Sequence, residues 1–448
     1  MLLGQLAKVK LPSLILLMGV LLCSGEDWPR WMGVNSDGVW KESGIRRDLP
    51  KGGAPVMWRV PVGWGYSGPA VASGFVYLSD YQRTKGNLSN HPGQSVRWEG
   101  RERLLCLDIE TGQEQWKYEV ERAYDLSYPG GPRATPTIAN GLVYFLGAMG
   151  DLVCLDAQTG KKKWERDFKK DFGAPQLIWG FSSHPLVVDG VVYCLAGGEG
   201  SLVVALDAST GQLKWKALSS ATQGYCPPTM VKAGGVEQLL IWHPSGLDAL
   251  NPKDGLCYWS LPLKPNYGMS VMAPQLYEGK LFASGMGRVG AMIKLDDLNP
   301  EAKFLWKGKP KSAMYCCNST PLIVDGVIYG SDIDSSYLIA ASVDDGTRYW
   351  QTHDPVFSDS KDQGSRYGTV YLAYHEANQQ FWMVNDSGDL ILAELSKEKY
   401  QELGRQHLLE PTNEAFGRPV VWSTPAYAQR SVLMRNDKEL VRVDLSEP

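Results

Sequence analysis

The chain has 448 residues, more than one compact core usually holds, so it contains either several domains or an array of small units that share one core. Its 48 glycines, 16 tryptophans and 21 tyrosines indicate many turns and aromatic packing, and 44% hydrophobic residues exclude a disordered chain. The formal net charge of -4 gives no basic field for a phosphate backbone, so we expect no nucleic-acid partner.

The first 25 residues have the pattern of a secretory signal. Two lysines precede an apolar run from Leu11 to Leu22, and small residues follow from Cys23 to Gly25. We expect cleavage of residues 1–25 and export to the periplasm or the cell exterior. The alternative is lipid anchoring at Cys23, which the bulky Leu22 disfavours. No other stretch is long enough for a transmembrane segment, and the odd number of remaining cysteines excludes a disulfide framework.

A proline-led pattern recurs along the rest of the chain. In each copy, an apolar alternating run follows the proline, and a glycine then precedes a second apolar run, which predicts a β-hairpin. The six prolines are Pro69, Pro136, Pro185, Pro228, Pro274 and Pro321. A less regular seventh start lies near Gly368, and an eighth lies at Pro425. Eight starts at this spacing are typical of propeller blades.

A second pattern, Asp-x-x-Thr-Gly-x-x-x-Trp, closes the units. Intact copies end at Trp116, Trp164 and Trp215, and altered copies end at Trp259, Trp306 and Trp350. The Asp can cap the turn, the Gly can take a positive φ, and the Trp can begin the last strand and pack between neighbouring sheets. We therefore expect four-stranded blades with tryptophan-docking turns.

The last unit lacks its fourth strand, because the sequence ends shortly after Asp444, where the turn and its tryptophan are due. Residues 56–61, with Trp58, have the missing pattern. Pairing this N-terminal strand with the last three strands would close the ring and remove two exposed edges. The sequence thus predicts an all-β, eight-bladed β-propeller over residues 54–448, after a leader at residues 26–53.

The docking units resemble the tryptophan-docking repeats of the pyrroloquinoline-quinone (PQQ) repeat superfamily over almost all of residues 54–448. The leader from Trp28 to Gly38 is similar to the start of PQQ-binding-like repeat proteins of planctomycete-type bacteria, although Met32 stands where those leaders often have Arg. The resemblance implies the same eight-bladed fold.

The loops before the inner strands should ring one mouth of the central channel. They contain aromatic and arginine side chains that could bind a planar, anionic or sugar-like ligand by stacking and charge-assisted hydrogen bonds. The predicted ligand-binding residues are Trp64, Tyr66, Arg133, Trp179, His184, Tyr225, Tyr267, Tyr315, Cys316, Cys317, Asn318, Arg366, Tyr367, Arg418 and Trp422. Alternatively, the aromatic rings only plug the mouth of the channel. For any single ring we favour plugging, whereas for Arg133 and Arg366 we favour ligand binding.

Two further features lie near this rim. An insertion from Asp80 to Arg103 should lie over the mouth, either as a functional loop or as a solvated lid. The adjacent Cys316 and Cys317 resemble a cysteine pair of PQQ-dependent alcohol dehydrogenases, but they occur later in the chain. We favour buried thiols or a local disulfide without a cofactor.

The rim segments contain Asn318 but no Asp or Glu. They therefore lack both the carboxylate ligands that Ca²⁺ prefers and a base to take the hydroxyl proton of an alcohol when its hydride is transferred. We therefore predict no catalytic residue, no metal and no cofactor. The predicted function is a monomeric, non-catalytic binding scaffold that holds a protein segment or a carbohydrate at this face. The alternative is a PQQ- and Ca²⁺-dependent dehydrogenase of alcohols or sugars. Other enzyme chemistry has no signature in the sequence.

Overall fold

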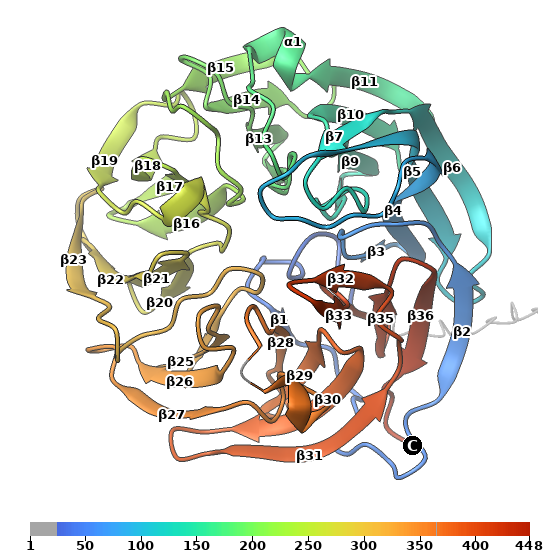
Figure 1. The fold of residues 1–448 in the computed structure, drawn as a ribbon. Helices are drawn as coiled ribbons and strands as arrows, with labels where there is room; N and C mark the ends of the chain where they lie inside the picture. Colours follow the sequence, from blue (N-terminus) through green and yellow to red (C-terminus); the bar gives the residue numbers. More distant parts are fainter. Residues whose placement is uncertain (1–24, 364) are drawn as a thin grey trace, which may run out of the picture.

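The computed structural model describes residues 25–363 and 365–448, so Cys23 and almost all of the predicted signal segment lie outside the described residues. Eight antiparallel sheets surround a central channel like the blades of a propeller (Figure 1). The prediction of an all-β, eight-bladed propeller is confirmed. Among the described residues, we find no helix with the length and apolar character that crossing a membrane requires.

The blades follow one another in chain order, and each inner strand comes first. Blade 1 contains β3 (Ala70–Ala72), β4 (Phe75–Lys85), β5 (Val96–Asp108) and β6 (Glu114–Glu121), with β7 (Tyr124–Leu126) paired to β5. Blade 2 contains β8 (Thr137–Ala139), β9 (Leu142–Leu146), β10 (Asp151–Asp156) and β11 (Lys162–Asp167), and α1 (Phe168–Phe172) follows it. Blade 3 contains β12 (Leu186–Val188), β13 (Val191–Leu195), β14 (Val203–Asp207) and β15 (Leu213–Ala217). Blade 4 contains β16 (Thr229–Ala233), β17 (Val236–His243), β18 (Gly246–Leu250) and β19 (Cys257–Leu261).

The second half of the ring repeats this order. Blade 5 contains β20 (Gln275–Tyr277), β21 (Lys280–Gly285), β22 (Val289–Leu295) and β23 (Ala302–Lys307). Blade 6 contains β24 (Leu322–Val324), β25 (Val327–Ser331), β26 (Leu338–Ser342) and β27 (Arg348–Thr352). Blade 7 contains β28 (Val370–His375), β29 (Gln380–Asn385), β30 (Asp389–Leu395) and β31 (Tyr400–His407). Blade 8 contains β34 (Ala426–Ala428), β35 (Ser431–Arg435), β36 (Glu439–Asp444) and β2 (Val56–Pro61), and the hairpin of β32 (Asn413–Ala415) and β33 (Arg418–Val420) precedes it.

The docking turns join each blade to the next, as the repeat predicts. Trp164 of blade 2 donates its indole N–H to the carbonyl oxygen of Ala208 in the turn of blade 3, at 3.0 Å. Its ring packs on Gly211, where a Cβ would lie 2.6 Å from the indole and the φ is +69°. Gly211 is therefore required twice, by the backbone conformation and by the ring above it.

The same indole bond recurs around the ring from Trp58, Trp116, Trp215, Trp306 and Trp350. Trp259 differs, because its indole N–H donates to Gln238 within its own blade. The turn of the next blade is the one that carries a two-residue insertion, between Asp296 and Trp306. The insertion thus coincides with the one departure from the docking pattern among the tryptophans described here.

The ring closes through the N-terminal strand. β2 pairs antiparallel with β36, and the register places Arg59 opposite Val441. Trp58 also docks blade 8 onto blade 1, because its indole N–H donates to the carbonyl oxygen of Ile109 at 2.8 Å. The predicted closure by residues 56–61 is therefore confirmed, and it ties the two ends of the propeller together.

The leader crosses the channel before it reaches β2. Trp28 exchanges two backbone hydrogen bonds with Val71 in blade 1, and the N–H of Ile138 in blade 2 donates to the carbonyl oxygen of Pro29. On the other side, β1 (Val39–Trp40) pairs in parallel with β28 of blade 7, near the centre of the ring (Figure 1). The leader thus forms one end of the space inside the propeller.

Candidate ligand cavity

The central channel contains a cavity of approximately 950 Å³. The loop before the inner strand of every blade contributes to its wall, and the leader contributes Trp28, Trp31 and Met32 at one end. Its volume lies at the upper end of the range for pockets that enclose small ligands. The cavity is therefore the candidate ligand site of the molecule.

Most of the predicted rim residues meet in this wall. The predicted residues that line it are Tyr66, Arg133, Trp179, His184, Tyr225, Tyr267, Cys317, Asn318, Tyr367 and Trp422. Their common feature is a position just before an inner strand, which directs the side chain toward the channel axis. This placement follows the geometry that the repeat predicted.

Three other predicted residues turn away from the cavity. Trp64 packs edge-on against the buried Trp98, with ring centroids 5.4 Å apart. Tyr315 is buried and donates its hydroxyl to the carbonyl oxygen of Lys309. Cys316 lies in a core cluster with side chains of blades 5 and 6. Alternation along the chain explains the last case, because Cys317 lines the cavity and its neighbour must face the other way.

The two remaining arginines also lie outside the wall. Arg418 is buried and forms a two-pronged ion pair with the carboxylate of Asp386, with Nη1 3.0 Å from Oδ1. It therefore has a structural partner in place of a ligand. Arg366, which the sequence analysis grouped with Arg133, has an exposed side chain and does not line the cavity. The surroundings of Arg366 and Arg418 therefore differ from those of Arg133.

Arg133 is the cation in the wall. Its guanidinium donates to the carbonyl oxygens of Ser127, Tyr128 and Gly131, and it lies over the ring of Tyr66 at 5.2 Å. Within the described residues, no carboxylate lies within ion-pair distance of it. Burial lowers the pKa of Arg133, yet an arginine keeps its charge in the neutral range. The wall thus carries a positive charge that forms no ion pair among the described residues. Backbone carbonyls and an aromatic face contact it, and Glu102 acts on it from a longer distance.

His184 supplies a neutral donor to the same cavity. Burial lowers the pKa of His184 to about 3, so the imidazole is uncharged at neutral pH. Its Nδ1 accepts the backbone N–H of Thr135 at 2.9 Å, which places the ring proton on Nε2. This N–H makes no hydrogen bond to a described residue and remains free for a ligand. Thr135 lies two positions after Arg133, so the two donors come from neighbouring loops.

The rest of the wall is mostly aromatic and sulfur-containing. Residues that sequence reasoning did not single out include Trp28, Trp31, Met32, Tyr128, Met272, Met286, Tyr371, Phe416 and Tyr427. The leader residues were missed because no repeat pattern shows where a segment outside the blades will run. Their density of tryptophan and methionine in a short stretch is the signal that could have found them.

The mouth is narrowed by two hairpins. The predicted insertion forms the long β4–β5 hairpin, and His91, Pro92 and Gly93 at its tip line the cavity. The tip contacts the β32–β33 hairpin, because the amide of Asn90 donates to the side chain of Asn413. The insertion therefore lies over the rim as predicted, in contact with the hairpin that precedes blade 8, the neighbour of blade 1 in the ring.

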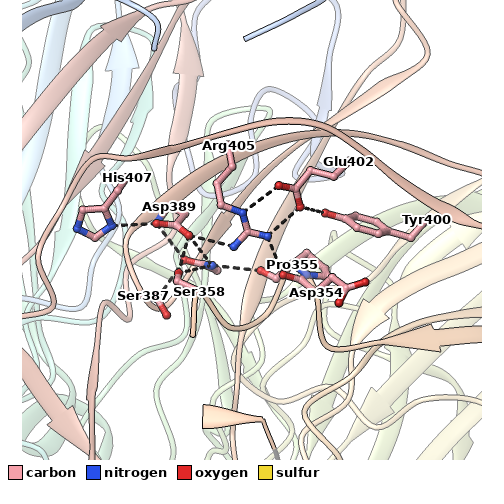
Figure 2. Close-up of polar contacts among 10 residues, drawn as sticks. Asp354, Pro355, Ser358, Ser387, Asp389, Tyr400, Glu402, Arg405 and His407 are labelled. Carbon is pink, nitrogen blue, oxygen red and sulfur yellow. Dashed lines mark hydrogen bonds and ion pairs between the residues drawn. The ribbon is translucent and has the colours of Figure 1, made fainter. Parts of the chain in front are cut away.

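A polar cluster on blade 7 contains a serine, a histidine and an aspartate, but it is not arranged as a catalytic triad (Figure 2). Asp389 stands in the middle: its carboxylate accepts from His407 Nδ1 at 2.9 Å and from the hydroxyl of Ser358. Arg405 also donates to Asp389 at 3.0 Å and to Glu402. A nucleophilic serine needs the histidine as its neighbour, so this cluster fits a structural role at the base of β30 and β31.

The cavity does not fit PQQ held by Ca²⁺. Calcium takes six to eight oxygen ligands, usually with carboxylates among them, and no Asp or Glu is among the described residues of the wall. Across residues 25–363 and 365–448, no cluster of three His, Cys, Asp or Glu side chains could hold a metal ion. Cys316 and Cys317 are free thiols, with burial raising the pKa of Cys317 to about 12.

Comparisons with known proteins agree with the fold. The structure is similar to BamB from Moraxella catarrhalis, with a TM-score of 0.56, 13% identity, and coverage of 87% of this chain and 97% of that one. It is also similar to the quinohemoprotein alcohol dehydrogenase from Comamonas testosteroni, with a TM-score of 0.58, 13% identity, and coverage of 93% and 80%. At this identity, both likenesses show the shared propeller and nothing more.

In sequence, the chain is 32% identical over 162 residues to the serine/threonine-protein kinase AfsK of Streptomyces griseus, which is 35% of this chain and 18% of the kinase. The chain thus spans less than a fifth of that relative. The family described as outer membrane protein assembly factor BamB matches residues 100–352, more than half of the chain. With its PQQ-type repeats and eight docked blades, the protein belongs to this family.

Proposed function

We propose that the protein is a non-catalytic binding scaffold that holds a protein segment in the central cavity, with export from the cytoplasm as its setting. The observation that carries the proposal is a wall built by the rim loops of all eight blades, rich in aromatic and methionine side chains and without a carboxylate. Such a wall can bury apolar side chains and can stack rings, but it offers no carboxylate to act as an acid or a base.

A protein segment fits this wall better than a carbohydrate. Each sugar hydroxyl needs a hydrogen-bond partner, and a buried hydroxyl without one costs about 1 to 3 kcal/mol. The wall has fewer polar side chains than aromatic and methionine side chains. Besides the tyrosine hydroxyls and the thiol of Cys317, the polar side chains are His91, Arg133, Gln176, Ser182, His184, Thr222, Asn318, Thr320 and Thr424. The family is described as an outer membrane protein assembly factor, which also favours a polypeptide as the ligand.

To test the proposal, a displayed library of random peptides is selected for binding to the purified protein, and the affinity of the enriched peptides is measured by calorimetry. Thr222→Phe, in the wall, should weaken binding at least about tenfold by filling the cavity. Lys117→Phe, on the exposed face of β6, is the matched control and should leave binding unchanged.

Two other results would contradict the proposal. Stoichiometric uptake of PQQ with Ca²⁺ and dye reduction with an alcohol or a sugar would support the dehydrogenase alternative. Binding of oligosaccharides, with loss of that binding in Thr222→Phe and no enriched peptide, would make the ligand a carbohydrate.

A further inference from the structure

The charge inside the cavity selects the kind of ligand. Arg133 has no acidic partner within ion-pair distance among the described residues. The charge of Glu102 raises the pKa of Arg133 without an ion pair. The Glu102 carboxylate instead accepts hydrogen bonds from the hydroxyl of Tyr124 and the backbone N–H of Ala148. Because a guanidinium in such surroundings gains strongly from an anion, the wall favours a ligand with one negative group.

The guanidinium of Arg133 suits a carboxylate, because its planar fork of N–H donors matches the two carboxylate oxygens. His184, on the adjacent loop, is tied to the Arg133 segment by the hydrogen bond from Thr135. Its imidazole is held by stacking on Trp31, with ring centroids 4.9 Å apart, and its Nε2–H adds a neutral donor to the same cavity.

The wall of blades 5 to 7, across the channel from Arg133 of blade 2, suits an apolar side chain. Met269, Met286 and Tyr367 pack around Cys317 in one cluster. Methionine and aromatic side chains adapt to apolar groups of different shape. A ligand with a carboxylate beside an apolar or aromatic group would therefore match the wall on both sides.

The shape of the cavity favours the end of a chain. Because the leader crosses one end, with Trp28 and Trp31 in the wall, a polymer cannot thread through the propeller. At the mouth, the side chains of Tyr267 and Phe416 are 79% and 43% exposed, and both also line the cavity. These two side chains can contact the part of a ligand that extends from the cavity into solvent. A polypeptide has such a part, and a small free acid does not.

We infer that the cavity holds the carboxyl-terminal end of a partner polypeptide, with the terminal carboxylate at Arg133 and the last apolar side chain against the methionine and aromatic wall. This inference rests on the proposed function and names the part of the partner that binds. The amino-terminal end of a chain carries the opposite charge and would be disfavoured by Arg133.

A peptide library displayed with free carboxyl ends tests the inference, and the enriched sequences are then synthesised with a free or an amidated carboxyl end. The free acid should bind the wild-type protein about tenfold more tightly or better by calorimetry, since a charge-assisted pair is lost on amidation. In Arg133→Met, the two forms should bind equally. Arg366→Gln is the matched control: it removes an exposed arginine near the same rim and should keep the preference.

The wild-type comparison needs no folded variant, so it decides the inference even if Arg133→Met is unstable. Equal binding of acid and amide would overturn the inference and leave the proposed function standing. The same holds if only a library with blocked or internal ends yields binders. Binding of 3-phenylpropionate with no enriched peptide would overturn the polypeptide partner in both proposals.

Discussion

The indole of Trp31 lies almost flat against the imidazole of His184, with ring centroids 4.9 Å apart and an interplanar angle of 11°. One ring comes from the leader and the other from the loop before β12, so the contact fixes the segment that closes one end of the cavity to the wall of blade 3. Burial keeps the imidazole neutral, and the neutral ring can therefore stack on the indole without the cost of a buried charge.

This arrangement predicts acid sensitivity. Burial lowers the pKa of His184 to about 3 from an ordinary value of 6.5, so between these values the unfolded chain binds a proton that the folded chain does not. The contribution to stability is complete above about pH 6.5 and is lost as the pH falls toward 3, by up to about 1.4 kcal/mol per pH unit.

His184→Phe, which keeps a ring for stacking, should remove this part of the pH dependence. Urea unfolding at pH 7 and pH 4.5 measures it: the wild-type midpoint should fall more than that of the variant. Equal falls in both proteins would mean that His184 is protonated in the folded state at pH 4.5.

The docking tryptophans are expected to act on stability and not on the cavity. Trp164→Ala should lower the free energy of unfolding by about 3 to 5 kcal/mol, because the indole is buried between blades 2 and 3 and the sheets cannot fill its volume. Trp164→Phe keeps much of the packing on Gly211 but loses the hydrogen bond to Ala208, and it should cost clearly less. Denaturant unfolding compares the two, and loss of ligand binding with unchanged stability in either variant would contradict the structural role.

The local repeat explains why the fold could be predicted from the sequence. A proline before an inner strand, a glycine in a tight turn and a tryptophan that packs on the next blade are short-range signals, and their recurrence in most of the eight units predicts a ring of blades. Tyr66, Tyr225 and Trp422 could be placed in the wall for the same reason, since each lies at a fixed position of the repeat.

The positions that could not be predicted depend on contacts outside the repeat. Trp31 belongs to the leader, whose path across the channel has no repeated pattern. Arg418 lies on the extra β32–β33 hairpin and turns toward Asp386, a partner in the preceding blade. In the sequence, both arginines lie shortly before an inner strand. Only the structure shows that Arg418 pairs with Asp386, whereas Arg133 lines the cavity and has no carboxylate within ion-pair distance among the described residues.

The Arg418 and Asp386 pair gives a prediction that separates the rim arginines. Arg418→Gln leaves the Asp386 carboxylate buried and should cost about 3 to 5 kcal/mol at pH 7, whereas Arg366→Gln removes an exposed charge and should change stability little. Burial already raises the pKa of Asp386, and loss of Arg418 raises it further. Stability should thus return as the pH falls and the acid is protonated, so the deficit of Arg418→Gln relative to wild type should shrink from pH 7 to pH 5. A deficit that stays constant over this range would show that Asp386 remains ionised in the folded variant down to pH 5.

Closure by the N-terminal strand gives the last prediction. β2 pairs along β36, Arg59 forms an ion pair with Glu439 at 3.0 Å, and Trp58 docks onto the turn of blade 1. Deleting residues 56–62 should therefore expose the edge of β36 and undock blade 8 from blade 1, because no other strand can take the place of β2. The expected result is loss of the cooperative thermal transition and aggregation at concentrations where the intact protein is soluble.

Deleting residues 87–93, the same length at the tip of the β4–β5 hairpin, is the control for this deletion. It shortens a hairpin that closes no blade, and it should leave the thermal transition in place. If the first deletion melts like the intact protein, the ring does not depend on β2, and other contacts between blades 8 and 1, such as the hydrogen bond from Arg442 to the carbonyl oxygen of Ile109, must hold it closed.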